Sequence, residues 1–489
     1  MADQFPTTDS ESIGQFVVVP KLPDGTDPDK SQVVRTGVLR YRPGRVELEV
    51  SPSFNPMTKW TESTPGRFTG TSNDELITDE AVILGTVVSS PQGVSLWQID
   101  SLRRNMIGFS SPGREEAGRE VLSAEWCLMG TQFPDEDVGF TSVTLDVTGL
   151  HRFADLPSVH PELPEQGLFP MRWVLDPPDA VVGSTEIPHK GSVTLAPAVR
   201  SSPPGRRDVQ ITTDTVVRFG LDQGARLPEV VSDLAIPMAS LLTILTGEEC
   251  SVRGLRVEDG EDRSAAVYGY VVDPSAPRDT KDLLLAVTSA GGPDFIGRWL
   301  AIVKQTSPVP QILAAAYAGE FMTVETEALS LCTAAETLHR CLFPDARRLS
   351  SATVEQGLAG LVDATLPSDV HDILSDALGT YLFEPSFPSR MADLAEPVFA
   401  AVPSCIGRLN RWKQVVTAQR VGLAHGLRND DTDMATMHAV NRSLRWMLTV
   451  RLLLAAGVEP AVLREATEAN RRYERDLRNW KRVLPKVFQ

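Results

Sequence analysis

An arginine and a histidine, Arg420 and His425, stand five positions apart in the C-terminal third of the chain. A guanidinium can hold a phosphate through parallel N–H donors, and an imidazole can take up or release a proton near neutral pH. Together they could cleave RNA without a metal ion, because the 2′-hydroxyl of RNA can itself attack the neighbouring phosphorus. We expect His425 to transfer the proton and Arg420 to stabilise the charge on the phosphoryl oxygens.

The helix that must carry this pair is predicted from its apolar spacing. Leu409, Trp412 and Val416 form one buried face, and Ser404 is a suitable N-cap, so we expect the helix to begin near residue 403. Gly426 directly follows the histidine and is suited to end a helix. The pair is therefore expected at the C-terminal end of its helix.

Other helices are predicted around this one. Apolar residues at spacings of three and four from Phe321 to Leu342 predict one long amphipathic helix. Further helices are predicted from Thr432 to Ala456 and from Pro460 to Leu484, and residues 281–306 are predicted to form two helical pieces separated by Gly-Gly-Pro at 291–293. The polar side of the last helix carries a row of arginines: Arg471, Arg472, Arg475, Arg478 and Arg482.

Two residues are candidates for supporting the Arg420 and His425 pair. Glu336 lies on the long predicted helix, three and four positions before His339 and Arg340, and we expect an exposed ion pair with one of these neighbours. Arg428, three positions after His425, is the other candidate for a supporting residue.

The N-terminal half has the shorter period of β-strands. Alternating or β-branched runs occur at residues 36–41, 46–50, 83–88, 94–99, 140–147, 209–217 and 267–272, and one helix is predicted at 234–246. Pro43 and Gly44 suit a type II turn between the first two strands. Residues 1–30 are rich in Asp, Ser, Thr and Pro and are predicted to be a flexible tail.

The predicted fold class is α+β and multidomain, a β-rich N-terminal module followed by an all-α helical bundle. The change of period near Pro274 places the β-rich domain at residues 31–275 and the helical region at 276–489, with its core at about 318–489. A chain of 489 residues is too long for one core, and 42% apolar and 23% charged residues are ordinary for a globular protein.

The charge is unevenly distributed. The whole chain carries a net charge of −17, but residues 401–489 hold 16 Lys and Arg against 8 Asp and Glu. A ligand within about 10 Å responds mainly to nearby charges, so the basic C-terminal part can attract phosphates although the whole chain is acidic. An arginine-rich solvated surface without a ligand is the alternative interpretation.

Several classes of protein are excluded or disfavoured. The chain contains no Gly-Lys pair for a Walker A loop, and GxGxxG, GxSxG and HExxH are also absent. The five cysteines are scattered without CxxC spacing, which argues against structural zinc and a disulfide framework and favours a reducing compartment. We expect no metal, no other cofactor and no membrane span, and a cytoplasmic location.

The order of motifs resembles a known family. Arg420 and His425 match the signature of HEPN domains, which are helical bundles with an arginine, four to six residues, and then a histidine. The stretches TGVL at 36–39, VELEV at 46–50, ILG at 83–85 and LMGTQF at 128–133 resemble the N-terminal domain of ApeA-like proteins, bacterial anti-phage factors with a HEPN domain behind it. FIGRWL at 295–300 and AAETLHR at 334–340 resemble the stretches between the two domains.

This resemblance implies a HEPN-type endoribonuclease in abortive-infection defence. It implies RNA as the substrate, with tRNA as one candidate, a phage-derived trigger, and a homodimer or higher symmetric oligomer. One Arg/His set offers too few groups for separate acid and base roles, so the family's pairing of two motif helices across a two-fold axis is chemically reasonable.

One position departs from the family pattern, and two alternatives remain open. Family members usually place Asn, Asp or His directly after the motif arginine, and this chain has Val421 there. In the first alternative the bundle is a weak or inactive HEPN-like module that binds RNA or a partner, with the N-terminal domain as sensor. In the second, the N-terminal domain senses a ligand or a phage protein and the bundle only dimerises.

Overall fold

The computed structural model describes residues 10–20, 34–42, 44–54, 58–72, 81–88, 92–106, 118–162, 172–186, 188–201, 211–321, 323–362, 364–380, 384–424 and 434–489. Contacts divide the chain into two compact units. The first comprises Met1–Leu242 and Cys250–Lys281, and the second comprises Thr243–Glu249 and Asp282–Gln489. The division falls a few residues beyond the predicted boundary at 275, and it assigns the end of one helix to the second unit.

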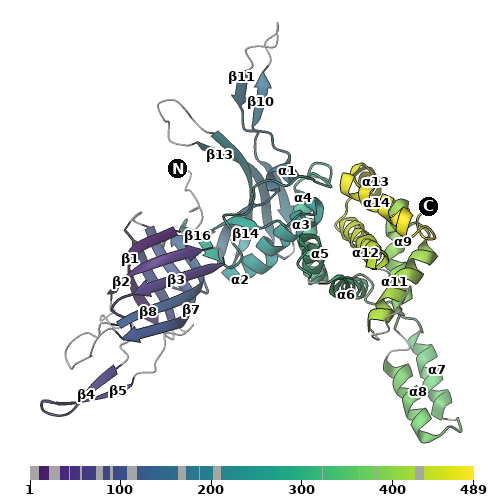
Figure 1. Cartoon of the computed structure of the whole chain (residues 1–489), viewed down its shortest axis with the longest axis horizontal. Helices are drawn as coiled ribbons and strands as arrows, with labels where there is room; N and C mark the ends of the chain where they lie inside the picture. Colours follow the sequence, from purple (N-terminus) through teal and green to yellow (C-terminus); the bar gives the residue numbers. More distant parts are fainter. Residues whose placement is uncertain are drawn as a thin grey trace. The chain divides into compact units, whose positions relative to one another are not determined.

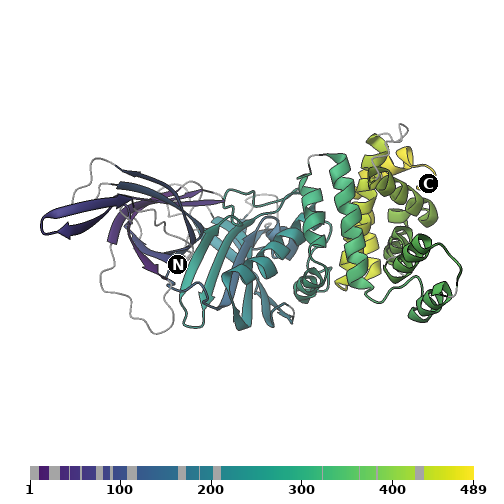
Figure 2. The same ribbon diagram turned by 90° about the horizontal axis from the view of Figure 1, so that it is seen from below.

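Part of the first unit is a closed β-barrel. Its strands are β1 (Ser10–Pro20), β2 (Val34–Arg42), β3 (Arg45–Val50), β6 (Ala81–Val87), β7 (Gln92–Met106) and β8 (Gly118–Gly130). Within the described residues they follow the antiparallel order β8-β3-β2-β1-β6-β7, and β7 pairs again with β8 to close the ring. Figure 2 shows these strands, at the purple end of the colour scale, curving around a common interior.

The barrel interior follows from the alternation of the strands. In β3, Val46, Leu48 and Val50 are buried, whereas the glutamates between them are partly exposed. Phe16 fills part of the interior opposite Gly85, where a Cβ atom would overlap the phenyl ring. A residue larger than glycine at position 85 would therefore displace the Phe16 side chain.

The predicted flexible tail is wrong for residues 10–20. These residues form β1, which pairs with β2 on one side and β6 on the other. Phe16 is only 1% exposed, and the burial of its ring outweighs the polar composition of the surrounding sequence. The remainder of the predicted tail, residues 1–9 and 21–30, lies outside the described residues.

The sheet continues beyond the barrel. From β8 the strand order is β16-β15-β9-β14-β13-β12, and every named pairing in this part is antiparallel. The strands are β9 (Phe140–Val147), β12 (Val181–Thr185), β13 (Gly191–Ser201), β14 (Ile211–Ala225), β15 (Val252–Asp259) and β16 (Ser264–Gly269). Two separate hairpins are formed by β4 (Thr58–Thr64) with β5 (Arg67–Ser72) and by β10 (Val159–Glu162) with β11 (Arg172–Leu175).

Helical segments accompany this sheet. They are α1 (Leu150–Ala154), α2 (Leu227–Val230), a π-helical turn η1 (Val231–Ala235) and α3 (Ile236–Thr246). In the described part of the chain, one stretch, Leu227–Thr246, is long and apolar enough to cross a membrane, but 72% of its most apolar window is buried inside the structure. That burial is typical of a core helix.

The second unit is helical (Figure 1, green to yellow). Its helices are α4 (Asp294–Thr306), α5 (Val309–Ala318), α6 (Val324–Leu342), α7 (Ser351–Val362), α8 (Ser368–Thr380), α9 (Phe387–Ala401), α10 (Pro403–Ile406), α11 (Leu409–Ala424), α12 (Met434–Ala455), α13 (Pro460–Ala469) and α14 (Arg471–Val483). The helix α12 is the centre of this unit, since it packs against α4, α5, α6, α9, α10, α11 and α14. The predicted α+β multidomain fold class is confirmed.

Three helix boundaries differ from the prediction. Of residues 281–306, only α4 is helical, since the residues before it form turns that end in Gly291 and Gly292 at positive φ. The motif helix begins at Leu409 instead of residue 403, because Gly407 at φ 63° separates the short α10 from α11. The last predicted helix is two helices, because the Asn470 side chain accepts a hydrogen bond from the Tyr473 N–H and caps α14.

Candidate functional site

Arg420 lies on α11 and faces α6, where it forms an ion pair with Glu336. The guanidinium Nη2 and Nε lie 3.2 and 3.3 Å from the same carboxylate oxygen, Oε1 of Glu336. The guanidinium carbon lies 5.5 Å from the centroid of the Phe387 ring at the start of α9. Three helices therefore fix the position of one partly exposed arginine.

The residue before Arg420 anchors α11 to the rest of the bundle. Gln419 is buried, and its Nε2 donates to Oδ1 of Asn441 on α12 at 2.7 Å. Asn441 donates in turn to Oε2 of Glu327 at 3.1 Å and to the Val324 carbonyl at 2.9 Å, both on α6. In a buried setting such hydrogen bonds are strong, so this network holds α6, α11 and α12 in one arrangement beside Arg420.

The predicted partner of Glu336 is wrong. Glu336 was expected to pair with His339 or Arg340 on its own helix, but it pairs with Arg420. His339 is buried and its Nε2 lies 2.8 Å from Oδ2 of Asp393, while Arg340 pairs with Glu384 at 3.3 Å. The rotation of α6 about its axis determines these pairs, because it directs Glu336 toward α11 and directs His339 and Arg340 toward Asp393 and Glu384.

The structure brings two of the four predicted site residues together. Arg420 and Glu336 are in contact. His425 and Arg428, together with Gly426, lie outside the described residues, since α11 is described as far as Ala424. Their predicted roles therefore stay predictions.

The surroundings of Arg420 limit the chemistry that this part of the bundle can perform. Burial raises the pKa of the nearby Cys332 thiol to about 12; Glu336 adds to this shift and Arg420 opposes it. A thiol with so high a pKa is protonated at neutral pH and is a poor nucleophile. Arg420 has five N–H donors, and those not directed at Glu336 can serve a phosphate. The described site therefore favours anion binding over covalent catalysis by cysteine.

Sequence reasoning missed several of these positioning residues. The buried polar network of Gln419, Asn441 and Glu327 depends on contacts among three helices, and the sequence spacing gives no sign of it. A polar residue on an otherwise apolar helix face, such as Asn441 between Val440 and Leu444, is the one available signal.

The fold and this geometry can be compared with known proteins. A family model described as ApeA N-terminal domain 1 matches residues 11–283, which is more than half of the 489-residue chain. The chain belongs to the ApeA N-terminal domain 1 family. No curated protein and no solved structure matches the chain.

The ApeA N-terminal domain begins inside β1 and ends before α4. Its start at residue 11 agrees with the position of β1 in the barrel. The predicted resemblance of the N-terminal part is confirmed, and membership of the ApeA N-terminal domain 1 family points to anti-phage defence. The match ends before the helices that carry Arg420, so the HEPN assignment of the second unit stays a prediction.

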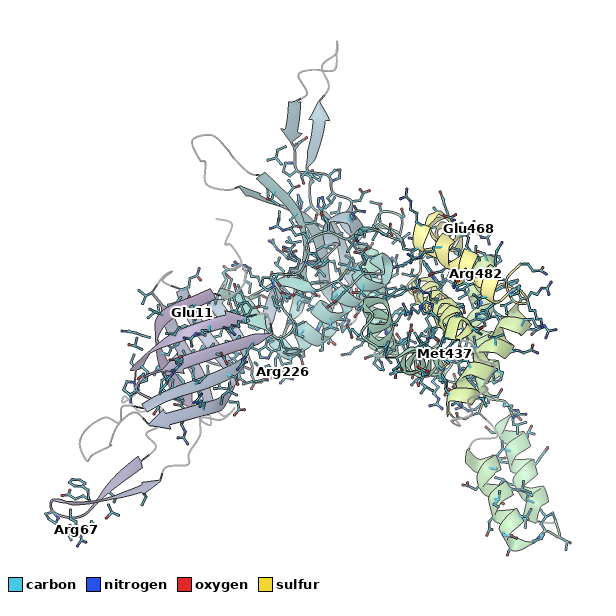
Figure 3. The ribbon with its side chains drawn as sticks, in the orientation of Figure 1. Glu11, Arg67, Arg226, Met437, Glu468 and Arg482 are labelled. Atoms are coloured by element: carbon cyan, nitrogen blue, oxygen red, sulfur yellow. The ribbon has the colours of Figure 1, made fainter. Side chains whose placement is uncertain are left out.

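The ApeA N-terminal domain contains a cavity of about 190 Å³. Trp97 and Trp126 line it together with the polar groups of Glu136, Asp137 and Arg226, the last of which is labelled in Figure 3. The Trp126 indole N–H is buried and has no hydrogen-bond partner within the described residues. Aromatic rings combined with a few polar groups are typical of small-ligand sites.

Proposed function

We propose that this protein is an anti-phage defence protein whose helical unit is a metal-independent, HEPN-type endoribonuclease. Arg420 and His425 are its catalytic residues, at the interface of a homodimer or a higher symmetric oligomer. The observation that carries this proposal is the ion pair between Nη2 of Arg420 and Oε1 of Glu336 on α6, at 3.2 Å. Arg420 directly follows Gln419, which is buried. Membership of the ApeA N-terminal domain 1 family supports the defence role.

The proposed reaction uses the 2′-hydroxyl of RNA as the nucleophile. His425 takes the proton from this hydroxyl, or gives a proton to the departing 5′-oxygen, while Arg420 stabilises the negative charge on the phosphoryl oxygens. Glu336 is a positioning residue, because its carboxylate sets the plane of the guanidinium. The 2′-oxygen forms a bond to phosphorus as the 5′-oxygen leaves, so the products carry a 2′,3′-cyclic phosphate and a 5′-hydroxyl.

The proposed reaction implies which partners the protein has. RNA is the substrate, with tRNA as one candidate, and a phage-derived molecule is the trigger. Two copies of the motif across a two-fold axis would supply both an acid and a base, so we expect at least a dimer. Light scattering on the full-length protein at micromolar concentration checks this, and a strict monomer would contradict a composite site.

The test of the proposed reaction is incubation of purified full-length protein with total RNA in EDTA, followed by mapping of the product ends. We expect cleavage that leaves cyclic phosphate and 5′-hydroxyl ends. Arg420→Lys should lose this activity, because an ammonium lacks the planar fork that grips two phosphate oxygens. Products with 3′-hydroxyl ends, or RNA that stays uncut after extract of phage-infected cells is added as the source of the trigger, would contradict the proposed mechanism.

One observation favours a second candidate function. Val421, an apolar side chain that is 40% exposed, follows Arg420 where a polar group would help to orient a phosphate. In this alternative the helical unit binds RNA or a partner without cleaving it, and the cavity of the ApeA N-terminal domain senses the phage ligand. RNA that is bound but uncut by wild-type protein, with no toxicity on overexpression, would support this alternative over the nuclease.

A further inference from the structure

The helical unit contains a cavity whose wall is rich in arginines and does not include Arg420. A cavity of about 110 Å³ lies between α12 and α14, and its wall includes four arginines: Arg442 and Arg445 from α12, and Arg472 and Arg475 from α14. In Figure 3, Met437 marks α12 and Arg482 marks α14. None of these four arginines belongs to the proposed RNA-cleavage site.

Arg472 is the most constrained of the four. Its guanidinium carbon lies 4.8 Å from the centroid of the Tyr317 ring and 5.0 Å from that of the Trp446 ring. Aromatic faces on a guanidinium hold its plane and leave its edge available for hydrogen bonds. Nη2 donates to the Ile244 carbonyl at 3.4 Å, whereas Nε and Nη1 are buried with no hydrogen-bond partner within the described residues.

The backbone is shaped to receive this guanidinium. Gly247, in the segment Thr243–Glu249 that belongs to the helical unit, lies at φ 70° against Arg472, and a Cβ atom there would overlap Nη1. Buried N–H groups without acceptors are unfavourable, and most buried donors in folded proteins are satisfied. The two unpartnered donors of Arg472 at this cavity therefore point to an acceptor supplied by a ligand.

The charges around the cavity do not cancel. Asp476 lines it, with Oδ1 accepting from Nη1 of Arg442 at 2.7 Å and Oδ2 accepting from the Trp446 indole N–H at 3.0 Å. Arg445 pairs with Glu327 of α6. Nε of Arg475 also lies 4.0 Å from Oδ1 of Asp476. Two carboxylates therefore face four arginines, and two positive charges remain in excess. An anion would be attracted to such a site.

The size and charge of the cavity indicate the class of anion. Sites that enclose a whole small molecule have volumes of about 300–1,000 Å³, so a cavity of about 110 Å³ suits one chemical group of a ligand. A phosphate monoester carries nearly two negative charges at neutral pH and three strong acceptor oxygens, which match the excess positive charge of the arginines in the cavity wall. We propose that this cavity binds a terminal phosphate monoester, carried either by a nucleotide or by the 5′ end of an RNA.

The experiment is calorimetric titration of the full-length protein. The probes are inorganic phosphate, adenosine 5′-monophosphate, and a 2′-O-methylated oligonucleotide with either a 5′-phosphate or a 5′-hydroxyl end, since methylation blocks cleavage by the 2′-oxygen. We expect saturable binding of phosphate at one site per chain. Tighter binding of the monophosphate identifies a nucleotide as the source, and preference for the 5′-phosphorylated oligonucleotide identifies an RNA end.

Variants on α14 locate the binding. Arg472→Gln should weaken phosphate binding at least tenfold, and Arg475→Gln several-fold. The Arg475 side chain is 66% exposed, so its replacement decides the question even if Arg472→Gln fails to fold. The matched control is Arg478→Gln, on the same helix, 71% exposed and outside the cavity wall, which should leave the affinity unchanged.

Three results would overturn the phosphate site. In the first, wild-type protein binds none of the probes. In the second, Arg478→Gln and Arg475→Gln lose the same amount of affinity for phosphate. In the third, Arg420→Gln loses phosphate binding while Arg472→Gln and Arg475→Gln keep it. The last result would place the phosphate at the proposed cleavage site. Absence of RNA cleavage, with extract of phage-infected cells added, by a protein that still binds phosphate through Arg472 would refute the nuclease and leave this inference standing.

Discussion

Arg420 already faces a carboxylate, and this contact determines what Glu336 can contribute. The two side chains are partly exposed, and exposed ion pairs stabilise proteins by only about 0–1 kcal/mol. Glu336 therefore adds little to the stability of the fold. Its larger effect is on the direction of the guanidinium, because Nε and Nη2 both lie within 3.3 Å of one carboxylate oxygen.

Replacement of Glu336 by Gln should distinguish an effect on the orientation of the Arg420 guanidinium from an effect on RNA binding. The amide keeps the shape but loses the charge, so we expect kcat for RNA cleavage to fall about tenfold through loss of positioning. KM should stay equal or fall, because the site becomes more positive. Steady-state kinetics measure this split, with Glu325→Gln on the same helix as the control. An unchanged kcat would show that the ion pair does not position Arg420.

His438 makes the helical unit sensitive to mild acid. Burial, and then the charge of Arg442, lower its pKa below the ordinary value of 6.5; Arg445 also lowers it, whereas Glu327 and Asp476 oppose the shift. The unfolded chain therefore binds more protons than the folded one just below pH 6.5. The contribution of His438 to the free energy of unfolding is fully present above pH 6.5. It is lost as the pH falls toward the pKa of His438 in the folded state.

The corresponding test compares unfolding of the helical unit at pH 7.5 and pH 5.5. We expect wild-type protein to lose stability between these values and His438→Gln to lose less, because glutamine does not titrate. Denaturant titration followed by the helical circular dichroism signal measures the difference. Equal losses in the two proteins would assign the acid sensitivity to other groups.

At the scale of helices, Asn441 connects the elements of the bundle. It is fully buried and bonds to α6 through Glu327 and Val324 and to α11 through Gln419. The bonds to Glu327 and Gln419 join buried polar side chains, which would otherwise lose hydrogen-bond partners. The residue thus fixes the arrangement of the two helices that carry Glu336 and Arg420.

Asn441→Leu should destabilise the helical unit by about 3 kcal/mol, because removal of the amide leaves several buried polar groups unsatisfied. The matched control is Asn479→Leu on α14, where the amide accepts an exposed hydrogen bond from Arg482 and the expected cost is below about 0.5 kcal/mol. Denaturant unfolding measures both. Similar small changes in the two variants would contradict the role of the network.

The sequence predicts where helices and strands lie better than it predicts which side chains of different helices are in contact. The apolar stripe of residues 321–342 is found in α6, with Leu331 and Leu338 buried, because helix period and burial are linked along one element. The interruption between α10 and α11 at Gly407 was not predicted, because the positive φ of this residue depends on how the chain turns in space. The Glu336 and Arg420 pair was missed for a related reason: it joins two helices whose mutual rotation the local sequence does not determine.

At the scale of the whole molecule, the domain boundary is not a single point in the sequence. The segment Thr243–Glu249 belongs to the helical unit although it precedes the last strands of the ApeA N-terminal domain. It contacts that unit through the Leu284 N–H, which donates to the Leu245 carbonyl at 2.9 Å, and through Arg472 beside Gly247. A helical fragment that starts after Lys281 therefore lacks part of its own core.

Limited proteolysis should cut the chain near residues 278–282 and leave a helical C-terminal fragment. We expect this fragment to melt at a lower temperature than the helical unit of the intact protein, since it has lost Thr243–Glu249. Mass spectrometry and thermal circular dichroism check both points. Cleavage within α6, or a fragment as stable as the intact unit, would contradict this division.

The most direct test of the central claim is the rate of RNA cleavage by His425→Ala at saturating protein. We predict a folded protein with wild-type oligomeric state and a rate that is about 10²–10⁴-fold lower, because the group that transfers the proton is gone. His371→Ala, which removes an imidazole from α8 of the same unit, should cleave at the wild-type rate. A wild-type rate for His425→Ala would contradict the nuclease assignment at this site.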